Sequence, residues 1–215
     1  MIQERESAGY LLGETARLLR ANAGLALAAL GVTTLVGAAA DLYPDFARLA
    51  GFASVPVNLA LQYEISLVLL VHYDLVESRA RRRRLWALLG VQLLSGLGIV
   101  LGLILLVLPG AYLFVRWSAA VPALIAEDVG VYESLGRGAE TVEGRFWHVL
   151  AALLVVWTPG VVGLLASVLV LEDEPLIGNL LLDLTINLSL IAGWHLAVAI
   201  YAGRQDGTRL AEVFA

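Results

Sequence analysis

Long apolar stretches separated by short polar segments dominate the sequence. Each stretch contains at most one Asp, Glu or Arg, and their lengths run from 17 to 28 residues. At about 1.5 Å per residue, a helix of this length matches the roughly 30 Å hydrocarbon core of a bilayer. The pattern predicts an all-α polytopic membrane protein, a six-transmembrane-helix bundle forming one membrane domain over residues 1–215. The predicted spans are 22–40, 52–73, 85–108, 110–126, 146–171 and 176–203.

The arginines test this arrangement, because positive charge collects on the cytoplasmic side of membrane proteins. Twelve of the fourteen arginines fall in alternate connecting segments, whereas Arg48 lies in an opposite segment and Arg116 within the fourth span. This asymmetry predicts a multi-pass membrane protein with both termini in the cytoplasm. The twelve are Arg5, Arg17, Arg20, Arg79, Arg81, Arg82, Arg83, Arg84, Arg137, Arg145, Arg204 and Arg209.

Two polar segments have the periodicity of amphipathic helices that lie on a membrane surface. From Gly9 to Arg20, leucines and a threonine share one side, and charged residues share the other. The segment from Val131 to Phe146 repeats this pattern, although Gly136 lowers its helical propensity, as do Gly138 and Gly144. We expect an N-terminal surface helix and another between the fourth and fifth spans.

Composition and missing motifs argue against catalysis. Hydrophobic residues make up 60% of the chain and charged residues 15%, and mean hydropathy is +0.82. The chain has no cysteine, which excludes disulfides and thiol chemistry, and no lysine, which excludes a P-loop and Schiff-base catalysis. The three histidines, His72, His148 and His195, have no metal-ligand spacing. We therefore predict a non-enzyme with no cofactor and no metal site.

Three charges lie inside predicted spans, where each costs at least about 2.5–3.5 kcal/mol. Counted from the outer ends of their spans, Glu64, Arg116 and Asp183 fall in one layer. We expect Arg116 to pair with Asp183 or Glu64, because a guanidinium offers a two-pronged donor to a carboxylate. The layer is either a solute or proton pathway or a buried ion pair that fixes helix register, and the structural reading is preferred.

Polar side chains also recur every four residues on two spans. Asn58, Gln62 and Ser66 form a stripe on the second span, and Asn179, Asp183 and Asn187 form one on the sixth. Such stripes face protein or water rather than lipid. Interhelical hydrogen bonding is favoured over a substrate groove.

Glycine and proline positions predict details of helix packing. Gly98 and Gly102 form a Gly-x-x-x-Gly pair, which either permits close helix approach or is an ordinary pair of small residues in a membrane helix. The Pro109-Gly110 dipeptide is expected to turn the chain between the third and fourth spans. Pro159 lies midway along the fifth span and should kink it, as static packing or as a hinge.

A run of five arginines, Arg79, Arg81, Arg82, Arg83 and Arg84, follows the second span. The run either sets topology alone or also binds anionic lipid headgroups, each charge being worth about 1 kcal/mol near the surface. It lies within a few residues of two spans and has no interleaved aromatic residues, so nucleic-acid binding is not expected.

The stretch from Pro109 to Pro122, followed by Glu127, Glu133, Arg137 and Glu140, resembles the glycerophosphoryl diester phosphodiesterase membrane-domain family. The likeness is strongest from about 105 to 147, and Gly136 and Gly138 depart from the usual pattern. In that family the membrane domain sometimes precedes a catalytic domain. The resemblance implies a non-catalytic module of the bacterial inner (cytoplasmic) membrane that binds membrane lipids or partner membrane proteins, in a scaffold or assembly role. The alternative is a small transporter or channel that uses the charged layer.

Overall fold

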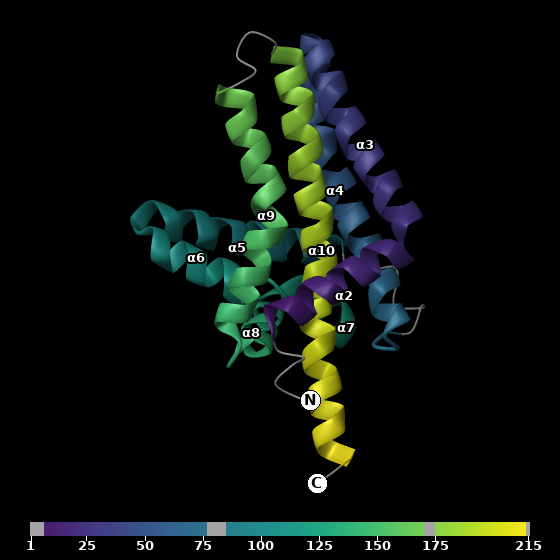
Figure 1. Cartoon of the computed structure of the whole chain (residues 1–215), viewed down its shortest axis with the longest axis vertical. Coiled ribbons are helices and arrows are strands. Elements are labelled where there is room, and N and C mark those ends of the chain that lie inside the picture. The colour runs from purple at the N-terminus through teal and green to yellow at the C-terminus, as the bar shows by residue number, and fades with distance from the viewer. Residues whose placement is uncertain (1–6, 77–84, 170–174, 214–215) are drawn as a thin grey trace.

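The computed structural model describes residues 7–76, 85–169 and 175–213, and the regular structure of these residues is all helix, with no strand. Figure 1 shows the helices in chain order from purple to yellow. They are α2 (Ala8–Ala21), α3 (Ala23–Leu42), α4 (Pro44–His72), α5 (Leu85–Leu105), α6 (Val107–Arg116), α7 (Ala120–Glu127), α8 (Val131–Val142), α9 (Phe146–Leu169) and α10 (Pro175–Val213).

Six segments of the described chain are long and apolar enough to cross a membrane, which confirms the predicted all-α polytopic class. Their ends differ from the predicted ends by a few residues, because helices continue until polar or turn-forming residues stop them. The segments are Ala23–Leu42, Ala47–His72, Leu85–Leu105, Val107–Glu127, Phe146–Val168 and Leu176–Gln205. The chain is a multi-pass membrane protein.

Four helices run along the long axis of the molecule, and one helical hairpin runs across it. Figure 1 shows α3, α4, α9 and α10 side by side and upright, whereas α5 and α6 extend sideways from them. The long helix α10 packs against α9, α3, α4 and α2, so it forms the centre of the bundle. The helix α2 crosses α10 below its middle, and the C-terminal end of α10 extends beyond α2 on that side (Figure 1).

The fourth apolar segment is broken into α6 and α7, which the sequence analysis did not predict. Three turn residues, 117–119, separate the two helices, and Pro122 lies in the first turn of α7. Proline cannot donate a backbone hydrogen bond and its ring clashes with the carbonyl four residues earlier, here that of Ser118. A helix therefore restarts just before Pro122 instead of continuing through it.

The turn between the third and fourth apolar segments lies earlier than predicted. A single extended residue, Leu106, joins α5 to α6, and Pro109 and Gly110 lie inside α6. Proline fits the first turn of a helix because its missing N–H has no intrahelical partner there. The predicted turn at Pro109-Gly110 is therefore wrong by about one helical turn.

Glycines hold the α5–α6 hairpin closed, in agreement with the close-approach reading of the Gly-x-x-x-Gly pair. A Cβ atom at Gly98 would lie 2.6 Å from the ring of Trp117. At Gly102 a Cβ would lie 2.7 Å from the backbone nitrogen of Gly110 on the facing helix. Only glycine allows two helix backbones to approach this closely.

Small residues also bring α9 and α10 together around the proline of α9. Pro159 lies inside the helix, and the next amide, Gly160 N–H, donates to Ser189 Oγ of α10 at 2.9 Å. Gly163 faces Thr185, whose side chain occupies the space that a Cβ would take. The neighbouring helix thus supplies a hydrogen bond beside the proline, as expected for static packing.

Both predicted surface helices are present. In α2 the buried residues are Leu11, Thr15 and Leu18, as the pattern predicted, and Ser7 caps the helix by accepting from Tyr10 N–H at 3.1 Å. The helix α8 forms despite its glycines. Gly138 lies where a Cβ would be 2.8 Å from the backbone nitrogen of Ala120, so this glycine permits close packing of α8 on α7.

Candidate functional site

A cavity of about 170 Å³ lies between α4, α5, α9, α10 and the turn that joins α6 to α7. Five of its lining side chains carry neutral hydrogen-bonding groups, and four are aromatic. The polar residues are Gln62, Ser66, Gln92, Ser95 and Ser118, and the aromatic residues are Phe114, Trp117, Trp157 and Trp194. Concave apolar surface with a few convergent polar groups is the usual form of a small-molecule site.

The hydrogen bonds of the cavity side chains leave capacity for a ligand. Gln92 Nε2 donates to Gln62 Oε1, and this pairing uses neither the Gln62 amide N–H groups nor the Gln92 carbonyl oxygen. The Ser95 and Ser118 hydroxyls donate to backbone carbonyls of their own helices, at 2.6 Å and 2.8 Å. Each hydroxyl oxygen can still accept, so the cavity offers both donors and acceptors.

The described lining contains no Asp, Glu, Arg, Lys or His. A charged ligand group moved from water into such a site would lose its hydration without gaining an opposite charge. The cavity therefore favours a neutral ligand that carries hydroxyl or carbonyl groups.

Of the two pairings that the sequence analysis offered for Arg116, the structure does not form the one with Asp183, and the one with Glu64 stays a prediction. The Arg116 Cζ atom lies 5.7 Å from the centre of the Tyr112 ring, and the Asp183 carboxylate packs against Gly37 of α3. Among the described residues no ion pair joins Arg116 to Asp183, and Asp183 Oδ2 has no hydrogen-bond partner. Neither residue lines the cavity, and Glu64 does not line it either.

The start of α4 explains why the depth estimate failed. This helix begins at Pro44 rather than near residue 52, so Glu64 lies 20 residues along it, about 30 Å from its start. Asp183 lies eight residues from the start of α10, or about 12 Å. Because α4 and α10 begin at the same end of the molecule (Figure 1), the two carboxylates lie at different depths.

The two polar stripes have different surroundings. Gln62 and Ser66 are buried and line the cavity, which agrees with a stripe that faces protein. Asn58 Nδ2 donates to the Ser54 carbonyl of its own helix at 2.9 Å. On α10, Asn187 is half-buried, but Asn179 is exposed and the stripe does not point as a whole into the bundle.

Charged residues gather outside the apolar segments. The predicted arginine run Arg79, Arg81, Arg82, Arg83 and Arg84 lies outside the described residues. On α8, Arg137 contacts Glu127 at 3.1 Å and Glu140 at 3.3 Å. The Tyr201 hydroxyl of α10 donates to Glu127 Oε1 at 2.9 Å. This network joins α7, α8 and α10 at one end of the bundle.

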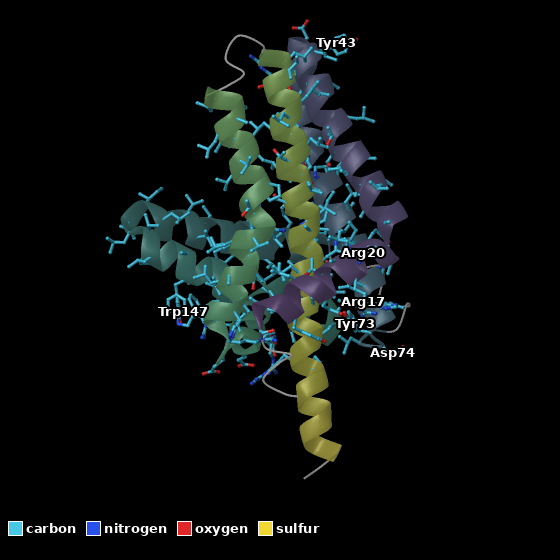
Figure 2. All side chains as sticks on the ribbon, viewed as in Figure 1. Arg17, Arg20, Tyr43, Tyr73, Asp74 and Trp147 are labelled. Atoms are coloured by element: carbon cyan, nitrogen blue, oxygen red, sulfur yellow. The ribbon has the colours of Figure 1, made fainter. Side chains whose placement is uncertain are left out.

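A second polar cluster fixes α2 to the end of α4. Arg17 Nε donates to Glu14 Oε2 at 2.9 Å, and the Tyr73 hydroxyl donates to Glu14 Oε1. Figure 2 shows Arg17, Arg20, Tyr73 and Asp74 together at the level of α2, far from Tyr43 at the opposite end. The hydrogen bond from Arg17 is the main reason that the pKa of Glu14 is lowered, and the bond from Tyr73 adds to it.

The lowered pKa of Glu14 predicts a dependence of stability on pH. A carboxyl with a depressed folded pKa contributes stability above its unfolded pKa, near 4.3, and loses it as the pH falls through the folded value. We expect the unfolding temperature to decrease when the pH is lowered below about 4. In Glu14→Gln this decrease should be smaller. Thermal unfolding in detergent, measured from pH 7 to pH 3, compares the wild type with Glu14→Gln. The same dependence of unfolding temperature on pH in both proteins would contradict the prediction.

No family model, no curated protein and no solved structure matches the chain. The family resemblance of residues 105–147 thus stays a prediction, carried by the residues of α6, α7 and α8.

The sequence analysis identified two of the cavity's five polar residues and missed the others. Gln92 is the one amide side chain in the uncharged stretch 85–108, and Ser95 follows it on the same helix face. These two residues could have been recognised from the sequence as a polar face on the third span. Ser118 gave none, because its place in the cavity depends on the break between α6 and α7.

Proposed function

We propose that the protein is a non-catalytic membrane protein that binds a neutral lipid in the cavity between α4, α5, α9 and α10. The single observation that carries this proposal is the lining, which combines neutral polar groups with three tryptophans inside a membrane-embedded bundle. Tryptophan gives a large apolar face with one polar edge, and this suits contact with an amphipathic molecule.

The size and chemistry of the cavity indicate the class of lipid. A cavity near 150 Å³ holds a group about as large as benzene, so 170 Å³ suits a head region of about six to eight heavy atoms. A glycerol unit with an ester has this size, and its hydroxyl and carbonyl groups match the paired glutamines and the serines. A neutral glycerolipid such as a diacylglycerol therefore fits better than an anionic phospholipid.

The alternative function, transport through the layer of Glu64, Arg116 and Asp183, gains no support from this arrangement, because none of the three lines the cavity. We also propose that the protein belongs to the glycerophosphoryl diester phosphodiesterase membrane-domain family. The arginine distribution supports cytoplasmic termini, and residence in the bacterial inner membrane rests on the family resemblance.

The proposal is tested by purification in mild detergent, followed by native mass spectrometry and identification of the bound lipid. We expect one neutral glycerolipid per chain. Gly193→Leu should abolish its retention, because Gly193 lines the cavity and a Cβ there lies 4.0 Å from Trp157 Nε1. Gly31→Leu on α3 is the matched control, since nothing lies within 4 Å of its Cβ position.

A second variant separates shape from chemistry. The double change Gln62→Leu with Gln92→Leu keeps a similar volume but removes both amide groups, and removing the pair together leaves no unpaired partner. Loss of one hydrogen bond to the lipid corresponds to about tenfold weaker binding. Equal lipid retention in all variants, retention of anionic lipid alone, or a protein partner without lipid would each overturn the proposal.

A further inference from the structure

The connection between α5 and α6 has no polar side chain. From Gly96 to Ala111 every residue is Gly, Ala, Val, Leu, Ile or Pro. Large residues at the tip face outward, with Leu105 76% and Leu108 81% exposed. Burial of each such side chain away from water is worth about 1.5–3 kcal/mol, so a tip in water would be costly. By contrast, the connection between α3 and α4 carries the exposed residues Asp41 and Asp45.

The short link between α5 and α6 leaves few backbone groups outside the helices. Leu106, the single linking residue, donates its N–H to the Gly102 carbonyl at 3.1 Å. Backbone groups at membrane depth must be paired within the protein, and the tight glycine-packed turn keeps the unpaired stretch to a minimum.

Aromatic contacts show that α6 lies across α9. Tyr112 stacks on Phe146 with ring centres 5.6 Å apart, while Phe114 contacts Trp157 at 6.2 Å. Phe146 and Trp157 are 11 residues apart on α9, about 16 Å, although their partners are two residues apart on α6. Side chains two residues apart point to opposite sides of a helix, so they reach both contacts only if α6 crosses α9. Figure 1 shows the same crosswise hairpin.

The same contacts limit how far the tip can reach. Leu106 is six residues from Tyr112, so even an α6 aligned with α9 would carry the tip only about 9 Å beyond Tyr112. Tyr112 contacts Phe146, the first residue of a 24-residue helix that is about 36 Å long. The tip therefore stays in the half of the bundle in which α9 begins.

That half carries α8 and its charged face. Both α5 and α6 pack on α8, and a Cβ at Gly90 of α5 would lie 3.0 Å from Val131 at the start of α8. The exposed face of α8 carries Glu133, Arg137 and Glu140, which belong at a membrane surface.

We infer that the α5–α6 hairpin does not cross the bilayer but lies within the leaflet on the side of α2 and α8, with its tip among the acyl chains. Four helices then cross the membrane: α3, α4, α9 and α10. An even number of crossings keeps both ends of the described chain on one side, in agreement with the arginine asymmetry. The partner of the exposed leucines is the hydrocarbon of that one leaflet.

Single-cysteine labelling tests this inference directly, because the chain has no cysteine of its own. Leu106→Cys and Val107→Cys report the tip, Tyr43→Cys the end between α3 and α4, and Glu143→Cys the end near α8. Sealed vesicles of each orientation are treated with a membrane-impermeant maleimide. We expect Tyr43→Cys and Glu143→Cys to react from opposite sides of the membrane. Neither tip variant should react from either side.

Two further measurements show whether an unlabelled tip cysteine lies in lipid. Both tip thiols should react fully after denaturation in detergent, which shows that the thiols are intact. A nitroxide attached at Leu106→Cys should be accessible to oxygen, which dissolves in lipid, and shielded from a water-soluble relaxation agent. Labelling of the tip from the Tyr43 side would show that the hairpin crosses, and labelling from the Glu143 side would place it in water. Either result would overturn the inference.

Discussion

Replacing Arg145 with leucine is expected to destabilise the protein more than any other single change to a polar side chain described above. Arg145 is buried, with 3% exposure, at the junction of α8 and α9. Its Nε–H donates to the Thr141 carbonyl at 3.0 Å, and its Nη2 donates to the Ile200 carbonyl of α10. The side chain thus closes the C-terminal turn of α8 and joins that turn to the central helix.

Arg145→Leu leaves the Thr141 carbonyl at the end of α8 without this donor, and it removes the hydrogen bond to the Ile200 carbonyl, which keeps its helical bond within α10. A buried acceptor without a partner costs about 1–3 kcal/mol and a lost hydrogen bond to a charged group about 1.5–3 kcal/mol, so the two together give about 2–6 kcal/mol. This is a large share of a typical folding stability of about 5–15 kcal/mol. Thermal unfolding in detergent, followed by size-exclusion chromatography, measures the loss as a lower midpoint and a lower monodisperse yield.

Arg20→Leu is the matched control, because Arg20 is exposed on α2 and the same substitution there removes a solvated charge. Exposed substitutions usually stay within about 0.5 kcal/mol. Arg145→Lys should fall between the two, since an ammonium cannot reproduce the planar fork of a guanidinium. Equal midpoints for Arg145→Leu and Arg20→Leu would show that the buried arginine does not hold α8 to α10.

Gly102→Leu is expected to open the α5–α6 hairpin and to weaken ligand binding at the same time. The new Cβ would lie 2.7 Å from the backbone nitrogen of Gly110, and a backbone atom cannot swing aside as a side chain can. Overpacking of this kind costs about 1–3 kcal/mol or more. Because α5 carries Gln92 and Ser95, displacing it also disturbs the cavity.

The control for this change lies six residues earlier on the same helix. Gly96→Leu adds the same side chain where nothing lies within 4 Å, and leucine favours a helix over glycine by up to about 1 kcal/mol. We expect Gly96→Leu to unfold at or above the wild-type temperature and to keep its lipid. Gly102→Leu should unfold at a lower temperature and lose its lipid. If the two variants behave alike, glycine contact does not close the hairpin.

The elements that the sequence predicted well are those fixed by local pattern. The leucines of α2 recur at helical spacing, and uncharged stretches such as 22–40 can lower their free energy only as helices in lipid. The pair Gly98 and Gly102 left two readings open, and the structure decided for close approach, to Trp117 and Gly110. The site was less predictable, because Gln62 and Ser66 could be recognised as a stripe but their partners come from other helices.

The sequence by itself determined that the chain is helical, embedded in a membrane and amphipathic at α2 and α8, because hydrophobic length and 3.6-residue periodicity are properties of a segment. Only the tertiary structure decided which polar groups meet and which helices stand upright. Arg116 and Asp183 illustrate the difference. Both depths were counted along straight spans, which suits Asp183 on the upright α10, but Arg116 ends the crosswise α6, where residue number does not measure depth. The direction in which a helix runs depends on contacts between segments that are distant in the sequence. The local spacing of residues does not determine these contacts.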